Sequence, residues 1–364
     1  MKAGIVGLPN VGKSTLFNCL SNAKAQSANF PFCTIEPNIG IVNVPDPRLE
    51  RLAELVNPEK TIPATVEIVD IAGLVKGASR GEGLGNQFLA NIRETDAIIH
   101  VLRCFEDDNV VHVDGSVDPI RDKETIDIEL QLKDLETVEK KLEKVTRSAR
   151  TGNKDAIKEK DVLEMIKSSL EASKNIRSII VSDTERNEYI KPLQLLTDKP
   201  VLYVCNVDEQ SALKGNLYVD EVKTIVDVEG SSLLVLAVSI EADINELESY
   251  EERKLFLDDL GLSEAGASKL IRSAYNLLNQ KTYFTAGEKE VRAWTITNGA
   301  TAPQAAGVIH TDFENGFIRA EVISFNDYNL FGSEQKVKEA GKIRVEGKEY
   351  LVQDGDVMHF RFNV

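Results

Sequence analysis

A phosphate-binding pattern stands near the start of the chain, at Gly7-Leu8-Pro9-Asn10-Val11-Gly12-Lys13-Ser14. It matches G-x-x-x-x-G-K-[ST] and lies between the apolar residues 3–6 and a segment with helical spacing, where a strand and a helix should hold it. The two glycines let the loop curl, so that backbone N–H groups and the helix N-terminus face phosphate oxygens. We therefore expect a nucleoside phosphate site made by Asn10, Val11, Gly12, Lys13, Ser14 and Thr15.

The order of the motifs assigns roles at the phosphates. Lys13 should reach the β- and γ-phosphates, and the Ser14 hydroxyl should bind Mg²⁺. A strand-like run, residues 65–69, leads into Asp70-Ile71-Ala72-Gly73, the D-x-x-G of a nucleotide switch. Asp70 would hold the metal through a water, and the Gly73 N–H would face the γ-phosphate.

A loop punctuated by proline, residues 29–37, lies between the two motifs and is a candidate first switch. Its Thr34 would be a second hydroxyl ligand when a γ-phosphate is present, so the expected metal ligands are Ser14, Thr34 and Asp70. Cys33 stands beside Thr34, where exposure would make it oxidisable. Burial of Cys33 as a small apolar side chain is the alternative.

The base-reading segment departs from the guanine pattern N-K-x-D. An apolar, β-prone run ends in Asn206-Val207-Asp208-Glu209, with valine for the lysine and glutamate for the aspartate. The added methylene moves the carboxylate by roughly 1.5 Å, enough to spoil its bidentate pair with guanine. Adenine offers an amine donor and a ring acceptor, which suit backbone carbonyls and an amide side chain. The expected base contacts are Asn206, Val207, Glu209 and Ser239, with adenine favoured and guanine as the alternative.

The position that orients the catalytic water in many small GTPases holds Leu74 here. An aliphatic side chain cannot form a hydrogen bond, so intrinsic turnover should be slow. His112 is the candidate to reach the γ-phosphate or its water, because neutral imidazole accepts a proton near pH 7; an ordinary surface histidine is the alternative. Asn10 is a candidate to hold K⁺ at the phosphates. The expected catalytic residues are Lys13, Gly73 and His112.

Composition and charge restrict the class of protein. The 364 residues are 42% hydrophobic and 28% charged, enough for two or three domains. No apolar run approaches the roughly 20 residues of a membrane helix, and no signal peptide is visible. The net charge of −16 argues against broad affinity for nucleic acid but leaves a local basic face open. We expect no membrane and no specific DNA partner.

The four cysteines, Cys19, Cys33, Cys104 and Cys205, form no C-x-x-C pair. This spacing indicates reduced thiols in a cytoplasmic compartment. All but Cys33 lie in expected strands or helices, so we expect them to be small core residues.

Strand and helix signals divide the chain into parts. Strands alternate with helices over residues 1–125 and again over 198–280, which predicts an α/β fold with a doubly wound, mostly parallel sheet. Between them, residues 126–197 carry apolar side chains three and four apart around a turn signal at 151–153. These are Ile128, Leu132, Leu135, Val138, Leu142 and Val145, then Leu163, Ile166 and Leu170. The pattern predicts an antiparallel helical hairpin, coiled-coil-like, serving either as a spacer or as a docking arm.

Residues 281–364 have a different character. Two strand-like runs, 291–296 and 317–322, flank a short alanine-rich segment, and glycine turns follow. This mixture predicts a small mixed β domain. The lone Trp294 is expected to pack in it, and a base-stacking platform is the alternative.

These motifs together resemble the Obg-like ATPases of the YchF family. The similar stretches are Gly4 to Thr15, Asn29 to Pro37, Asp70 to Val75, Gly81 to Asn86, Thr282 to Gly287 and Ala302 to Gly307, which cover essentially the whole chain. The resemblance implies an Obg-type G domain with a P-loop, the inserted coiled coil, and a C-terminal TGS domain with a ubiquitin-like β-grasp. It also implies a preference for ATP and a ribosome or its large subunit as partner.

The expected function is a Mg²⁺-dependent ATPase that works as a switch, with ATP ordering residues 29–37 and 73–85. Two alternatives stay open at this point. One is an Obg-type GTPase, and the other is a nucleotide-gated binding module with negligible turnover.

Overall fold

The computed structural model of the chain describes residues 1–22, 39–71, 84–113 and 115–363. The described residues form two compact units, one of residues 1–22, 39–40 and 67–270, the other of residues 41–66 and 271–363. The predicted domain boundaries remain a prediction, and the second unit includes a segment, 41–66, that the sequence assigned to the nucleotide domain. None of the helices in the described ranges is long and apolar enough to cross a membrane.

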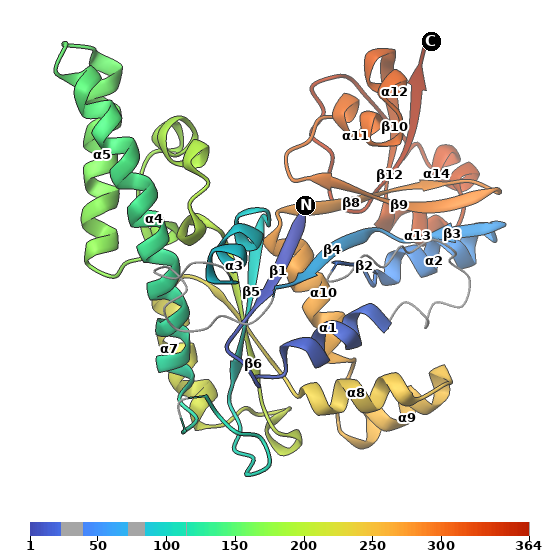
Figure 1. Ribbon diagram of the computed structural model, residues 1–364. Coiled ribbons are helices and arrows are strands. Elements are labelled where there is room, and N and C mark those ends of the chain that lie inside the picture. Colours follow the sequence, from blue (N-terminus) through green and yellow to red (C-terminus); the bar gives the residue numbers. More distant parts are fainter. Residues whose placement is uncertain (23–38, 72–83, 114, 364) are drawn as a thin grey trace. The chain divides into compact units, whose positions relative to one another are not determined.

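The strands are β1 (Lys2–Val6), β2 (Ile39–Asn43), β3 (Lys60–Ile62), β4 (Thr65–Asp70), β5 (Ala97–Arg103), β6 (Val201–Asn206), β7 (Ser232–Leu236), β8 (Gln280–Ala286), β9 (Glu290–Thr297), β10 (Phe317–Ser324), β11 (Arg344–Glu346) and β12 (Asp356–Phe362). The helices are α1 (Lys13–Asn22), α2 (Pro47–Val56), α3 (Leu84–Arg93), α4 (Pro119–Ala149), α5 (Lys154–Glu171), α6 (Asp183–Glu185), α7 (Leu217–Glu229), α8 (Val238–Glu246), α9 (Tyr250–Asp259), α10 (Gly266–Leu277), α11 (Ala302–Ile309), α12 (Thr311–Asn315), α13 (Phe325–Phe331) and α14 (Glu334–Glu339). Figure 1 shows their arrangement.

The first sheet has the order β2-β4-β1-β5-β6-β7, and the four strand pairs from β4 to β7 are parallel. All side chains of β5 and β6 are buried, as continuous apolar strands in a parallel sheet should be. Helices α4 and α7 lie on one side of this sheet and α1 and α8 on the other (Figure 1), which confirms the doubly wound α/β prediction. The carboxyl ends of β1, β4, β5 and β6 therefore share one edge.

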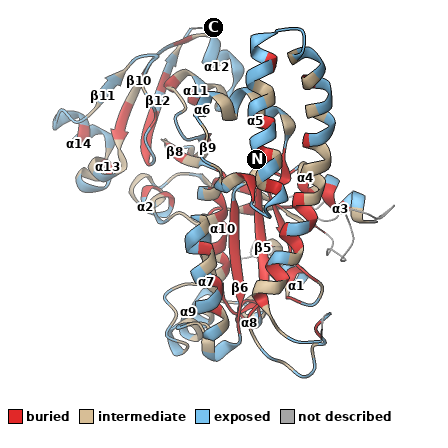
Figure 2. Cartoon of the chain, turned by 90° about the vertical axis from the view of Figure 1, so that its left-hand side faces the viewer, coloured by how far each residue is buried: buried red, intermediate tan, exposed pale blue. Residues whose placement is uncertain are grey.

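The predicted helical hairpin is formed by α4 and α5. Asp118 caps α4 by accepting from the Arg121 N–H, and proline follows at the first helical position, so the helix begins before residue 126. Gly152, with φ of 84°, makes the turn, and Asn153 caps α5. A shared apolar cluster closes the hairpin, with members Val138, Val145, Ala156, Val162, Leu163, Ile166, Leu170, Ile176, Ile190 and Leu195 (buried residues in Figure 2).

One residue of the predicted apolar stripe differs. Ile128 is 48% exposed, because α4 near its start packs with polar side chains that the apolar spacing did not reveal.

The second sheet has the order β11-β10-β12-β8-β9-β3 and mixes parallel with antiparallel pairs. Ala302, Ala305 and Ala306 on α11 are fully buried against it, because small side chains allow close approach of helix and sheet. Trp294 packs on this core and donates its indole N–H to the Thr285 Oγ1 at 2.9 Å, so the packing prediction is confirmed. The predicted mixed β domain is present, and β3 (residues 60–62) adds a strand to its sheet by pairing with β9.

Three cysteines are buried, as the sequence predicted: Cys19, Cys104 and Cys205. Burial raises the pKa of the Cys19 thiol to about 11, so this thiol stays protonated at neutral pH. Cys33 lies outside the described residues.

Candidate nucleotide site

The loop between β1 and α1 has the backbone shape of a phosphate cradle. A Cβ on Gly7 would lie 2.7 Å from the Val101 carbonyl oxygen, and a Cβ on Gly12, whose φ is +93°, would lie 2.5 Å from Asn206 Nδ2. Asn10 adopts a left-handed conformation, with φ of 61°. Such strain in a non-glycine residue is typical of functional loops. Both glycines are therefore required by close approach, as the motif predicted.

Asn206, at the carboxyl end of β6, braces this loop. Its Nδ2 donates to the Val11 carbonyl at 3.0 Å, and its Oδ1 accepts from the Val238 N–H at 3.0 Å. The side chain is 4% exposed. The buried amide thus ties the P-loop to the start of α8, a positioning contact that the sequence did not predict.

The side chains expected to bind phosphate and metal lie together at the same sheet edge. Ser14 Oγ is 3.4 Å from Asp70 Oδ2, and Lys13 is 9% exposed. Asp70 Oδ1 is buried and has no hydrogen-bond partner among the described residues. Burial raises the pKa of Asp70, although Lys13 and the Ser14 hydrogen bond oppose this shift. The Ser14 hydroxyl lies beside one oxygen of this carboxylate, and the other oxygen, which has no partner among the described residues, is open to a ligand. This pair of oxygen donors fits Mg²⁺.

The remaining base-site candidates differ in accessibility. Val207 is 2% exposed and its N–H donates to the Leu236 carbonyl at 3.0 Å. Asp208 caps the short turn Glu209–Ser211 by accepting from the Ser211 N–H. Glu209 and Ser239 are exposed, and Ser239 lies in the first turn of α8 beside the brace formed by Asn206.

His112 lies in the segment that follows β5, next to the P-loop. Asn10 Nδ2 donates to the Val111 carbonyl at 3.1 Å. The imidazole itself contacts Asp122 on the first turns of α4, with 2.8 Å between His112 Nε2 and Asp122 Oδ2. The two side chains are only 4% and 2% exposed. The alternative of an ordinary surface histidine is therefore wrong, because the His112 side chain is buried and hydrogen-bonded to Asp122.

Arg103 is a site residue that sequence reasoning missed. It ends β5, is 1% exposed, and donates to three backbone carbonyls, those of Phe105, Val110 and Asp107, at 2.8–3.2 Å. Its guanidinium therefore fixes the loop that carries His112. An arginine at the end of a strand whose other residues, apart from His100, are apolar was the signal available.

Four other residues of interest lie outside the described residues. They are Thr34 and Gly73, expected at the metal and the γ-phosphate, with Cys33 and Leu74 beside them.

Comparison with known proteins places the chain in a family. A model described as a 50S ribosome-binding GTPase matches residues 2–148, and the C-terminal model of the YchF GTPases, described as a protein of unknown function, matches residues 280–363. The protein named ribosome-binding ATPase YchF of Haemophilus ducreyi is 58% identical over 363 residues, covering 100% of this chain and 99% of the relative. The protein of that name in Bacillus subtilis is 55% identical, with 100% of both chains covered.

A solved structure agrees with the sequence comparison. The YchF GTPase of Schizosaccharomyces pombe superposes with a TM-score of 0.90 at 41% identity, covering 99% of this chain and 97% of that one. Its fold is the one described above, a P-loop domain with an inserted hairpin and a C-terminal β-grasp (TGS) domain. The resemblance suggested by the motifs is thereby confirmed: the chain belongs to the YchF family.

Proposed function

We propose that this chain is a cytoplasmic, Mg²⁺-dependent ATPase that acts as a nucleotide-controlled switch on the ribosome. The observation that carries the proposal is a P-loop braced by Asn206 together with an Asp70 oxygen that has no hydrogen-bond partner in the part of the chain that the structure describes. The relatives named above support the activity and the partner, since their names say ribosome-binding ATPase.

The chain's own groups supply the phosphate chemistry. Backbone N–H groups of residues 10–15 and the ammonium of Lys13 bind the β- and γ-phosphates, as in other P-loop proteins. Ser14 and Thr34 would hold Mg²⁺, Asp70 would support it through a water, and the Gly73 N–H would face the γ-phosphate. When bound, Mg²⁺ neutralises charge that develops on the phosphate oxygens. If K⁺ also binds here, its ligand would be the side-chain oxygen Oδ1 of Asn10, because the side-chain Nδ2 donates a hydrogen bond to the Val111 carbonyl.

ATP is the nucleotide that the base side favours. The Asn206 amide already donates to Val11 and accepts from Val238, and the Val207 side chain is buried. Neither residue can therefore replace the lysine of a guanine reader. The exposed Glu209 is one methylene longer than the aspartate that pairs with guanine. The S. pombe relative is nevertheless named a GTPase, so Obg-type GTP hydrolysis is the competing function.

Calorimetry with Mg²⁺ and either ATP or GTP tests the base choice. We expect tighter binding of ATP, and equal or tighter binding of GTP would contradict the proposal. Glu209→Asp should shift the ratio toward GTP, whereas Val207→Lys would force a charge into a 2% exposed position and lower stability. The matched control is Glu246→Asp, the same substitution at an exposed residue at the far end of α8.

Phosphate release separates a turning-over switch from a binding module. We expect slow release by the full chain alone and faster release with purified ribosomes. Co-sedimentation with ribosomes should depend on whether ADP or a non-hydrolysable ATP analogue is bound. Absence of release even with ribosomes would favour a nucleotide-gated binding module.

His112 is the proposed group for the catalytic water. Its Nε2 is held by Asp122, so the imidazole would have to leave this partner to reach a γ-phosphate. Leaving would remove one of the two side-chain partners of the buried Asp122 carboxylate, with Arg121 at 3.2 Å as the other, and this loss costs free energy. The slow turnover expected without a partner has a physical source in this contact.

A further inference from the structure

The end of the helical hairpin is the basic exception in an acidic chain. We call residues 140–160 the hairpin tip; they carry eight Lys and Arg against three Asp and Glu, while the whole chain has a net charge of −16. The tip covers the last turns of α4, the connecting turn and the first turns of α5. Charges of one sign gathered on a short surface attract a partner of the opposite sign.

Only half of the tip cations form a salt bridge within the described part of the chain. Lys140, Lys141, Arg147 and Lys160 form salt bridges with glutamates of the hairpin. Lys144, Arg150, Lys154 and Lys158 are exposed and form no salt bridge among the residues that the structure describes. Lys154 and Lys158 lie one helical turn apart on α5, about 5.4 Å along its axis. Their charge is directed to solvent.

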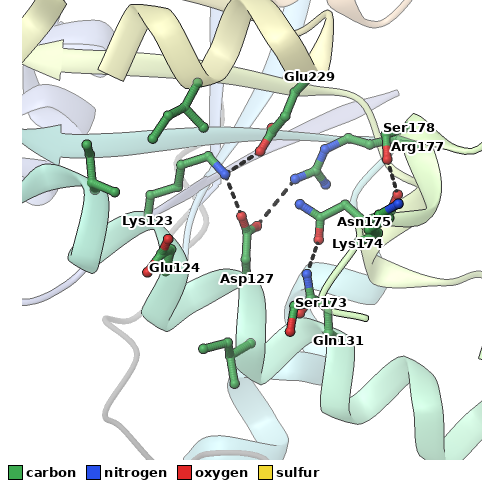
Figure 3. A pocket seen from close by; sticks show the side chains of 13 residues that line it. Lys123, Glu124, Asp127, Gln131, Ser173, Lys174, Asn175, Arg177, Ser178 and Glu229 are labelled. Carbon is green, nitrogen blue, oxygen red and sulfur yellow. Dashed lines mark hydrogen bonds and ion pairs between the residues drawn. The ribbon is translucent and has the colours of Figure 1, made fainter. Parts of the chain in front are cut away.

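The opposite end of the hairpin is fixed. Its root is a group of four charged side chains: the buried Lys123 and Asp127 on α4, and the half-buried Arg177 after α5 and Glu229 on α7 (Figure 3). The Lys123 ammonium bonds Asp127 at 2.7 Å and also Glu229, and Arg177 bonds Asp127 at 3.3 Å. The hairpin root therefore holds the tip at a defined place relative to the first sheet.

The chemistry of the tip selects the kind of partner. Residues 140–160 contain no Phe, Tyr or Trp, so they offer no platform on which a base could stack. Exposed Lys and Arg side chains bind phosphate groups independently of sequence. The acidic remainder of the chain repels a polyanion, so only the tip should approach it.

We propose that the hairpin tip is a docking surface for the phosphodiester backbone of RNA, contacted through Lys144, Arg150, Lys154 and Lys158. The inference deepens the proposed function, because it rests on ribosome binding and assigns the contact to ribosomal RNA. It also decides between spacer and docking arm, which the sequence left open.

The test replaces these four residues in the full chain. The tip variant Lys144→Gln, Arg150→Gln, Lys154→Gln and Lys158→Gln keeps helix propensity nearly constant. The control variant Lys214→Gln, Lys223→Gln, Lys254→Gln and Lys348→Gln removes the same charge from exposed positions elsewhere. Each protein is titrated with a labelled 20-nucleotide single-stranded RNA between 50 and 200 mM KCl and is co-sedimented with purified ribosomes.

The expected slope of log affinity against log salt is about −3 for four contacts to a single strand, so the parent should weaken roughly 50-fold over this range. The tip variant should bind RNA and ribosomes at least roughly tenfold more weakly at 50 mM KCl and lose most of the slope. The control variant should behave like the parent, and basal ATPase should be unchanged in both.

Three outcomes overturn the inference. One is equal loss in tip and control variants, which would indicate a general charge effect. Another is a parent that binds ribosomes while the tip variant binds them equally well. The third is tighter binding of poly-L-glutamate than of RNA at equal salt, which would indicate an acidic protein as partner. If the parent itself fails to co-sediment with ribosomes in any nucleotide state, the proposed function fails separately.

Discussion

The first unit surrounds two aspartates with opposite environments. At the hairpin root, burial would raise the pKa of Asp127, but the charges of Arg177 and Lys123 bring it below its usual range. At the P-loop, burial raises the pKa of Asp70, and the nearby Lys13 and Ser14 do not offset it. The fold supplies Asp127 with its cations, whereas one oxygen of Asp70 has no hydrogen-bond partner within the described ranges. A buried acid with its own partners stabilises the fold, whereas one that lacks them fits a ligand.

Removing one partner at the hairpin root should have the largest effect. Asp127→Ala leaves Lys123 and Arg177 buried with less compensation, which typically costs about 3–5 kcal/mol of unfolding free energy. Urea titration of the full chain measures this loss. Glu139 lies on α4, like Asp127, and is a surface partner of Lys167 on α5. Glu139→Ala should therefore cost only about 0–1 kcal/mol. Equal losses would mean that the root is not a special stabilising cluster.

At the P-loop the opposite result is expected. Lys13→Ala should lower kcat/KM for ATP by roughly 10²–10³, as when other donors to a transition state are removed. The urea midpoint should hardly change, because no salt bridge of Lys13 occurs among the described residues. A large loss of stability with preserved activity would reverse the distinction between the two regions.

His112 lies between the two regions, next to the P-loop and bonded to α4. His112→Ala should lower turnover at least roughly tenfold while ATP affinity changes little, since the imidazole acts on the water rather than on binding. Single-turnover phosphate release and calorimetry measure the two quantities. His310→Ala, at a histidine whose side chain is 60% exposed in the second unit, is the control. Unchanged turnover of the His112 variant with K⁺ present would assign the water to a partner.

A smaller effect concerns pH and His100, which is fully buried in β5 near the root. Burial lowers the pKa of His100 to about 3, with Asp127 opposing and Lys123 and Arg177 reinforcing this shift. Between the unfolded pKa near 6.5 and the folded pKa, only the unfolded chain takes up this proton. The free energy of unfolding therefore decreases by about 1.4 kcal/mol for each unit by which the pH is lowered. His100→Phe keeps a ring near Tyr203, whose centroid lies 5.5 Å away, and should remove this slope. Urea midpoints at pH 7, 6 and 5 measure it, and an unchanged slope would assign it to other groups.

The sequence predicted best what short patterns determine. The P-loop needs a fixed spacing of glycines, and the hairpin needs apolar residues at helical spacing, so both could be predicted without the fold. The brace formed by Asn206 could not, because it joins residues 195 positions apart. The same holds for Arg48, which bonds Asp354 at 2.6 Å within the second unit although 306 positions separate the two residues. Partners that are distant in sequence leave no local pattern.

Helix α4 runs without interruption from the turn that bears Asp122 to the hairpin tip. Its 31 residues span about 46 Å at 1.5 Å per residue. By simple leverage, a rotation of about 5° at the His112 end displaces the far end by about 4 Å over this length. A rotation too small to disturb the sheet would thus move the basic hairpin tip by more than the length of a hydrogen bond.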